Sequence, residues 1–198
     1  MFDKVAETYR PMVVWGARID GAKHCSVGSD NRAGGAMAAQ HLIRSGCKRI
    51  AFFGDPGVPE FAQRLEGVEW AVKAAGLSPA EPVLPVHLTP ETAYEAISDY
   101  LAKGHPAEGI VAASDIIAMS ATRALHAHGF DVPGQVSVTG FDDISIAAHT
   151  NPPLTTVRQD FERGAALLAE LLFKRIAGEE TASVELTPEL IVRESTKS

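Results

Sequence analysis

Cysteine is scarce in this sequence of 198 residues, which has two, Cys25 and Cys47. Their spacing fits neither a CxxC motif nor a zinc finger, so we expect free thiols in a reducing cytoplasm rather than a disulfide framework. No apolar run approaches the roughly 20 residues of a membrane-spanning helix, and no signal-peptide pattern opens the sequence. We therefore expect a cytoplasmic protein that makes no contact with a membrane.

Positive charge is scarce as well. The sequence has 18 lysines and arginines against 25 acidic residues, which gives a formal net charge of −7. Surfaces that bind phosphate backbones are typically basic, so this balance argues against DNA binding by this stretch of chain. Contact with DNA would need a segment that this sequence lacks.

The common motifs of catalysis are missing. The sequence contains no GxSxG nucleophile elbow, no HExxH zinc motif, no Walker loop and no GxGxxG fingerprint. Its seven histidines are scattered, and His126 and His128 lie two apart in an expected helix, where they face different sides. We predict no catalytic residue, no metal site and no cofactor.

The composition is that of an ordinary globular protein, with 45% hydrophobic and 22% charged residues, and the length suits one large domain or two small lobes. Strands are expected at residues 12–16, 49–53, 82–86, 109–113, 136–140, 155–157, 184–186 and 190–192. Helices are expected at residues 2–9, 31–45, 60–75, 90–101, 115–128 and 160–176. Single helices between strands predict βαβ units, and therefore an α/β fold with a mainly parallel sheet.

Polar side chains follow two of these strands. The β-branched stretch 136–140 reads as a buried strand, and Asp142 and Asp143 come directly after it. The strand at residues 155–157 is followed by Gln159 and Phe161. Ligands of open α/β sheets bind at the carboxyl ends of the strands, so these residues indicate the wall of a polar small-molecule site.

Asp142 and Asp143 cannot both reach one target from an extended backbone, because neighbouring side chains face opposite ways. We expect one carboxylate to enter the site and the other to cap the following turn. The pair is therefore weak support for a metal or phosphoacceptor site. It suits an acceptor of sugar hydroxyl groups better, and Asp142 is the preferred candidate.

The segment Gly140-Phe141-Asp142-Asp143, followed by Pro-Leu-Thr-Thr-Val-Arg-Gln-Asp-Phe at residues 153–161, resembles the effector-binding domain of the LacI/GalR family of bacterial transcription regulators. The resemblance extends over nearly the whole chain. It implies a type I periplasmic-binding-protein-like fold, with two lobes of parallel sheet flanked by helices.

The resemblance also implies how the chain divides. Residues 1–29 would form part of an N-terminal lobe, residues 30–157 the C-terminal lobe, residues 158–187 a return to the first lobe, and residues 188–198 a return to the second. Compared with the family, the sequence lacks the helix-turn-helix headpiece and the first βα units. We therefore expect a truncated product with an incomplete N-terminal lobe.

Family positions carry over to residues of this chain. Asp142 matches the aspartate that contacts the effector, and Arg64, in an Arg-x-x-Gly motif, matches an arginine that enters the cleft. The guanidinium fork suits paired hydroxyls or a carboxylate. The alternative for Arg64 is a solvated helix arginine.

Ser114 and Asp115 resemble an Asn-Asp pair at a strand-to-helix junction, and a helix cap would explain them equally well. Gln159 and Phe161 match positions at the crossover and the cleft wall, with core packing as the alternative for Phe161. Trp15 and Ser29 border the cleft in the same scheme, and Trp15 could stack on a sugar face or simply fill the core.

These matches predict the effector-sensing core of a LacI/GalR-type regulator. A small effector, a sugar or sugar derivative, would bind between the lobes and reorient an attached headpiece, which alone would contact DNA. The resemblance also implies a homodimer. A sugar-binding protein of a transport system with the same fold is the alternative, and an α/β enzyme that uses Asp142 or Asp143 is a third possibility.

Overall fold

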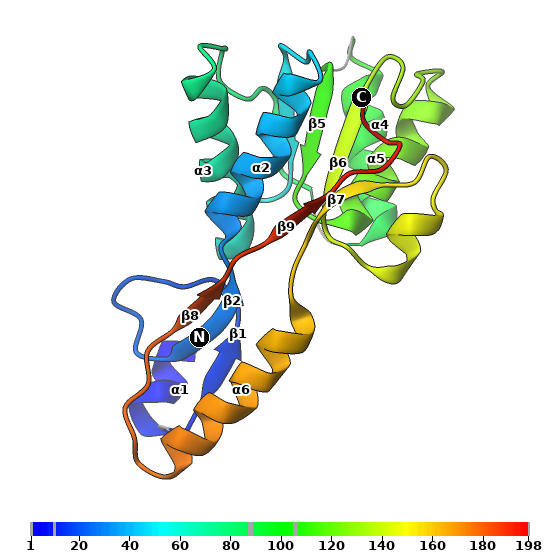
Figure 1. Cartoon of the computed structure of the whole chain (residues 1–198). Helices are drawn as coiled ribbons and strands as arrows, with labels where there is room; N and C mark the ends of the chain where they lie inside the picture. Colours follow the sequence, from blue (N-terminus) through cyan, green and yellow to red (C-terminus); the bar gives the residue numbers. More distant parts are fainter. Residues whose placement is uncertain (1, 10, 87–88, 105–106, 198) are drawn as a thin grey trace. The chain divides into compact units, whose positions relative to one another are not determined.

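The computed structural model describes residues 2–9, 11–86, 89–104 and 107–197. The chain divides into two compact units, Met1–Asp30 with Gln159–Pro188, here called the smaller unit, and Asn31–Arg158 with Glu189–Ser198, the larger unit. It therefore passes from one unit to the other three times, as the sequence colouring of Figure 1 shows.

The larger unit is built on a six-stranded sheet in the order β4-β3-β5-β6-β7-β9, counted over the residues that the structure describes. The strands are β3 (Ile50–Phe53), β4 (Val83–Leu84), β5 (Gly109–Ala112), β6 (Ser137–Asp142), β7 (Thr155–Arg158) and β9 (Glu189–Ile191). All neighbours pair in parallel except β7 and β9, which are antiparallel. The mainly parallel sheet expected from the βαβ pattern is confirmed.

Helices cover both faces of this sheet. They are α2 (Asn31–Arg44), α3 (Pro59–Ala74), α4 (Pro90–Leu101) and α5 (Asp115–Ala127), with a short 3₁₀ helix, η1 (Ser145–His149). In Figure 1, α2 and α3 lie together on one side of the sheet and α4 and α5 on the other. A central strand such as β3, with all four residues buried, therefore reads as a continuous apolar run.

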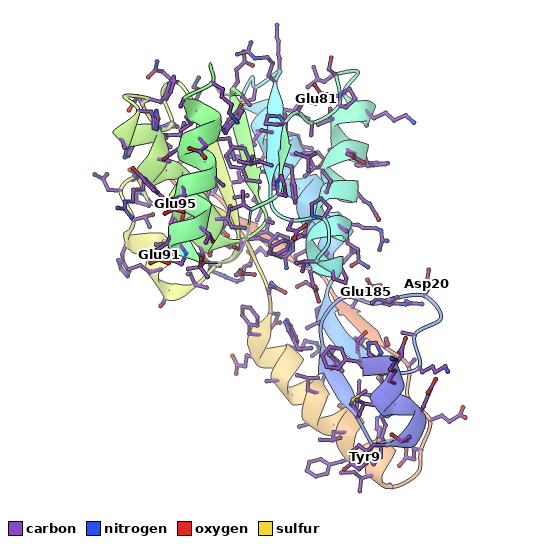
Figure 2. All side chains as sticks on the ribbon, turned by 180° about the vertical axis from the view of Figure 1, so that it is seen from behind. Tyr9, Asp20, Glu81, Glu91, Glu95 and Glu185 are labelled. Atoms are coloured by element: carbon purple, nitrogen blue, oxygen red, sulfur yellow. The ribbon has the colours of Figure 1, made fainter. Side chains whose placement is uncertain are left out.

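Helix α4 shows how local sequence sets these elements. Thr89 accepts a hydrogen bond from the backbone N–H of Thr92, and Pro90 takes the first helical position, where its missing N–H costs nothing. The face of α4 that carries Ala93, Ile97 and Leu101 is buried. Glu91 and Glu95 project from the opposite, exposed face (Figure 2).

The strand order predicts where a ligand would bind. Strand β3 lies between β4 and β5, so the chain reverses direction across the sheet as it passes from β4 to β5. In open α/β sheets such a switch point leaves a crevice beyond the carboxyl ends of the two strands where connections diverge, here β3 and β5. The residues that follow β3 and β5, including the start of α3 and of α5, are thus placed at this edge.

Helices α2 and α3 pack unusually close at this edge. A Cβ atom added at Gly35 of α2 would overlap the backbone carbonyl of Arg64 in α3, and one added at Gly67 would overlap the carbonyl of Arg32. The two glycines therefore let the helix backbones touch. The contact brings the first residue of α2, Asn31, beside Arg64.

The smaller unit has a parallel sheet in the order β1-β2-β8, with a core that includes Val27 and Leu171. Its elements are α1 (Phe2–Thr8), β1 (Val13–Trp15), β2 (Cys25–Ser29), α6 (Phe161–Ile176) and β8 (Val184–Leu186). The sequence analysis missed β2, because Cys-Ser-Val-Gly-Ser holds one β-branched residue and only two apolar ones, with serine and glycine at the other positions. All five of its residues are nevertheless buried.

Replacing Gly35 or Gly67 by alanine should destabilise the protein. Alanine normally stabilises a helix by about 1 kcal/mol relative to glycine, but here the added methyl forces α2 and α3 apart, at a cost of about 1–3 kcal/mol. Urea unfolding measures the change. Lys73→Ala, at an exposed position of α3, is the control, and stabilisation by either glycine substitution would contradict the close contact.

Candidate ligand-binding site

Arg64 of α3 is the centre of the candidate site. Its exposed fraction is 5%. Nε donates a hydrogen bond of 2.8 Å to Asn31 Oδ1, and Nη1 donates to the backbone oxygen of Ala113, just beyond β5. The guanidinium carbon lies 3.6 Å from the ring centroid of Phe141 in β6. Arg64 is therefore a buried, fixed cation and not a solvated helix arginine.

Asp142, the last residue of β6, faces this guanidinium. Its Oδ1 lies 3.9 Å from Arg64 Nη1. Burial lowers the pKa of Arg64 to about 10, while Asp142 acts in the opposite direction. Arg64 thus keeps its charge at neutral pH. The structure brings the two preferred candidates, one hydrogen-bond donor and one acceptor, to the same edge of the larger unit.

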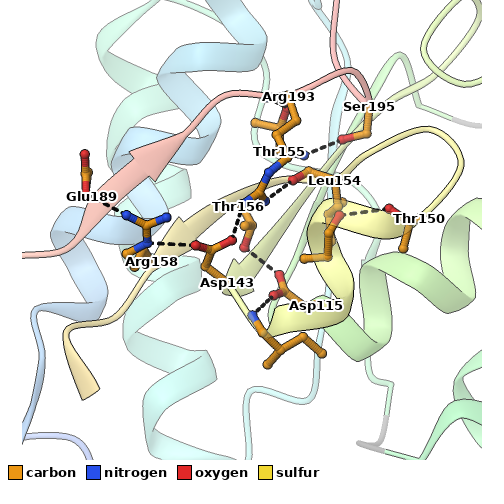
Figure 3. A network of polar contacts seen from close by, with 12 residues as sticks. Asp115, Asp143, Thr150, Leu154, Thr155, Thr156, Arg158, Glu189, Arg193 and Ser195 are labelled. Carbon is orange, nitrogen blue, oxygen red and sulfur yellow. Dashed lines mark hydrogen bonds and ion pairs between the residues drawn. The ribbon is translucent and has the colours of Figure 1, made fainter. Parts of the chain in front are cut away.

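Asp143 has different partners. Its Oδ2 accepts a hydrogen bond of 2.7 Å from Arg158 Nε, and its Oδ1 accepts one of 2.6 Å from Arg193 Nη2 (Figure 3). Burial raises the pKa of Asp143, but the hydrogen bonds from the two arginines outweigh burial and hold the pKa below its usual range. The sequence suggested that this carboxylate would cap the following turn. Instead, two arginines hold it.

Ser114 and Asp115 connect elements of the larger unit. Ser114 Oγ accepts a hydrogen bond of 3.3 Å from the backbone N–H of Ile117 and so caps α5. Asp115 is fully buried and accepts hydrogen bonds from the backbone N–H of Ile144, at 2.8 Å, and from Thr156 Oγ1, at 2.5 Å (Figure 3). Asp115 therefore ties α5 to the loop after β6 and to β7.

Asp115 is also the acid with the most perturbed pKa in this region. Burial raises its pKa to about 7, the hydrogen bonds from Thr156 and Ile144 lower it, and the nearby charges of Asp142 and Asp143 raise it further. The group consequently carries a proton part of the time near neutral pH.

The other sequence candidates lie in the smaller unit. Trp15 ends β1 and its ring centroid lies 5.4 Å from that of Phe161, the first residue of α6. Phe161 is 47% exposed, so it does not fill a core as the alternative reading held. Ser29 and Gln159 are both buried, and Ser29 Oγ has no hydrogen-bond partner among the described residues.

Two residues of the site escaped sequence reasoning. Asn31 was expected only as the start of a helix, yet its amide oxygen holds Arg64 while its Nδ2 donates to Gln63 Oε1, at 3.3 Å. Arg193 follows the last strand with no motif to mark it. The only signal for either was position, a polar side chain at the end of a predicted strand or at the start of a helix.

Within the described ranges, no cluster of histidine, cysteine or carboxylate side chains could hold a metal ion. Neither does any described helix combine the length and apolarity needed to cross a bilayer. The arrangement around Arg64 can donate and accept hydrogen bonds and can attract charge.

Sequence comparison relates the chain to known proteins. Residues 39–196 match a family model described as a periplasmic binding protein-like domain. HTH-type transcriptional regulator CelR of Thermobifida fusca is 38% identical over 170 residues, which cover 84% of this chain and 50% of CelR. HTH-type transcriptional repressor PurR of Pasteurella multocida is 34% identical over 198 residues, which cover 96% of this chain and 58% of PurR.

Solved structures agree. A complex of transcriptional regulator CelR with cellobiose has a TM-score of 0.84 and 35% identity, covering 92% of this chain and 58% of that one. A LacI family regulator from Enterococcus faecium with bound ribose has a TM-score of 0.88 and 25% identity, covering 100% of this chain and 76% of that one. The chain spans 50% to 58% of the length of the two curated relatives.

The perturbed pKa of Asp115 predicts how stability depends on pH. The pKa is about 7 in the folded chain against an ordinary value of 3.8, so the stability that the proton contributes is complete below pH 4 and is lost as pH rises through 7. An uncharged asparagine side chain can accept from Ile144 and donate to the Thr156 hydroxyl, which is able to accept. Asp115→Asn should therefore raise stability at pH 8 by on the order of a few kcal/mol and leave it little changed at pH 4.

Urea unfolding at several pH values between 4 and 8 measures this difference, with Asp99→Asn, an exposed position of α4, as the control. Other groups titrate in both proteins. The deciding quantity is therefore the difference in free energy of unfolding between the variant and the natural chain at each pH. A difference that stays constant across this range would contradict the raised pKa.

Proposed function

Because this chain belongs to the periplasmic binding protein-like family that LacI-type transcriptional regulators share, we propose that it is the effector-sensing core of such a regulator. It binds a small sugar-like molecule and couples that binding to operator affinity through a DNA-reading headpiece outside this sequence. The observation that supports this proposal is the buried Arg64 guanidinium, which faces Asp142 at the carboxyl edge of a mainly parallel sheet.

The chemistry of this pair suits a sugar. A hydroxyl group both donates and accepts hydrogen bonds, and Arg64 offers donors while the Asp142 carboxylate offers acceptors. Arg64 is already held by Asn31 and Ala113, so little of its conformational freedom remains to be lost on binding. Cellobiose and ribose, which occur in the solved relatives, are the first sugars to test.

Further contacts are proposed from the family positions. Trp15, Ser29, Gln159 and Phe161 of the smaller unit, together with Ser114 and Asp115, are candidates for effector contact. The Trp15–Phe161 pair presents aromatic surface of the kind that stacks on the apolar face of a sugar ring. Residues 1–29 with 158–187, and 30–157 with 188–198, are proposed as the two lobes.

The proposed mechanism involves binding without turnover. An effector that has different affinity for two arrangements of the lobes shifts their populations, and the free energy of that shift comes from the difference in affinity. No bond is made or broken. The regulator would act in the cytoplasm as a homodimer. The transport alternative is not favoured, because the curated relatives above are transcriptional regulators.

A thermal-shift screen of sugars tests the proposal. A true effector at about 100 times its Kd stabilises the folded state by about 2.7 kcal/mol, which should raise Tm by several degrees for a chain of this size. Asp142→Asn, which keeps the side-chain volume and an acceptor oxygen but loses the charge, should reduce the shift to a small fraction of its natural size without unfolding the protein, and so should Arg64→Gln if that variant folds.

Glu66→Gln is the matched control, since Glu66 lies on α3 two residues from Arg64 but is exposed. It should respond to the sugar as the natural chain does. If no sugar in the panel, including cellobiose and ribose, raises the Tm of the natural chain, the proposal of a sugar effector fails. If Asp142→Asn still responds in full, the site is misplaced.

A further inference from the structure

A row of charged side chains crosses the ends of β6, β7 and β9 in the larger unit (Figure 3). Asp143 follows β6, Arg158 ends β7 and Glu189 begins β9. Arg158 Nη1 lies 3.5 Å from Glu189 Oε2, and Arg158 Nε donates to Asp143 at 2.7 Å. On the other side of Asp143, Arg193 Nη2 donates to Asp143 Oδ1 at 2.6 Å. We call Asp143, Arg158 and Arg193 the clamp.

Arg193 is fixed more firmly than an ordinary surface arginine. Its backbone N–H donates to Thr155 Oγ1 at 2.9 Å, and its Nη1 donates to the backbone oxygen of Leu154 at 2.7 Å. Two residues further on, Ser195 Oγ donates to the carbonyl of Val138 at 2.7 Å and accepts the N–H of Thr155 at 2.8 Å. The C-terminal segment is thus anchored to β6 and β7, and the backbone that carries the Arg193 guanidinium is held in place beside Asp143.

The backbone that carries the aspartates is unusual. Asp142 has a φ of 119° and Asp143 a φ of 54°, both in the region that side chains other than glycine rarely adopt. Such conformations persist only where the surroundings impose them, and they concentrate at binding sites. Asp142 is also the register partner of Arg158 across the β6–β7 pair, so the clamp lies directly beside the strained residue.

From these contacts we infer that Arg193, with Arg158, is a positioning residue for the effector site. The two arginines hold the carboxylate of Asp143 on one side of the chain, and this fixes the preceding peptide. Asp142 is thereby turned to the other side, where its Oδ1 faces Arg64. The part of this inference that concerns effector affinity rests on the proposed function. The part that concerns the conformation of Asp142 does not.

We expect Arg193 and Arg158 to contribute unequally to holding the Asp143 carboxylate. The side chain of Arg193 is 17% exposed and that of Arg158 is 48% exposed. Water screens the exposed pair more, and Arg158 also divides its charge between Asp143 and Glu189. Loss of Arg193 should therefore disturb Asp142 more than loss of Arg158. Loss of Glu189, which touches the row only at its outer end, should disturb it least.

Crystal structures of Arg193→Gln and of Glu189→Gln test the conformational part. In Arg193→Gln we expect Asp142 to leave positive φ and its carboxylate to move away from Arg64. In Glu189→Gln both should remain in place. If Asp142 in Arg193→Gln keeps its φ and its distance from Arg64, the inference is wrong, whether or not the protein binds a sugar.

Calorimetric titration with cellobiose tests the functional part. Arg193→Gln should weaken binding about tenfold or more, Arg158→Gln by less, and Glu189→Gln by less than about twofold. In an Asp142→Asn background, Arg193→Gln should cause no further loss, because it acts through Asp142. An equal loss in both backgrounds would assign Arg193 a merely structural role and overturn the inference.

The crystal structures and the titrations together distinguish failure of the proposed function from failure of the positioning role. If the natural chain binds neither cellobiose nor any other sugar of the panel, the proposed function fails while the crystal structures still decide the positioning role. If Arg193→Gln does not fold, the structure of Arg158→Gln takes its place, with a smaller displacement of Asp142 expected and an unchanged Asp142 counting against the inference.

Discussion

The burial of one guanidinium organises the larger unit. An ionised group removed from water is tolerated only when its hydrogen bonds are replaced, because the lost hydration otherwise costs several kcal/mol. Arg64 meets this demand with partners from separate elements: Asn31 at the start of α2, the carbonyl of Ala113 beyond β5, and the Phe141 ring and Asp142 from β6. The close contact of α2 with α3 is a condition for this arrangement, since it brings Asn31 within reach.

Three aspartates lie in the region around the ends of β6 and β7, and each has different surroundings. Asp143 is neutralised by two arginines, and Asp115 is buried with a pKa raised to about 7. Asp142 stands opposite Arg64 at 3.9 Å, which is longer than a direct charge-assisted hydrogen bond. The three roles depend on one another, because a full charge on Asp115 would repel the other two carboxylates. Of the three, Asp142 is the carboxylate that faces Arg64, as the proposed sharing of a bound hydroxyl group requires.

Local signals in the sequence were enough for most of the fold. The comparisons confirm the periplasmic-binding-protein-like α/β class, and caps such as Thr89 and Ser114 act where their residue types predict. Strand β2 was missed because burial, and not β-propensity, makes it a strand. The clamp could not be predicted from the sequence, because Asp143 and Arg193 lie 50 positions apart and meet only when β9 pairs with β7. A contact between residues so far apart leaves no periodic pattern in the sequence, unlike a helix or a strand.

The charge balance of the proposed site bears on what could occupy it. An anionic effector would gain from Arg64, yet Asp142 faces the same guanidinium and already offsets that charge. From this pair a carboxylate or phosphate would therefore meet one negative charge for the one positive charge, and repulsion by Asp142 is costly where the dielectric constant is low. A neutral polyol meets no such penalty, because its hydroxyl groups donate to Asp142 and accept from Arg64. The pairing of a buried arginine with an aspartate, and not the arginine alone, is what makes a sugar the better occupant.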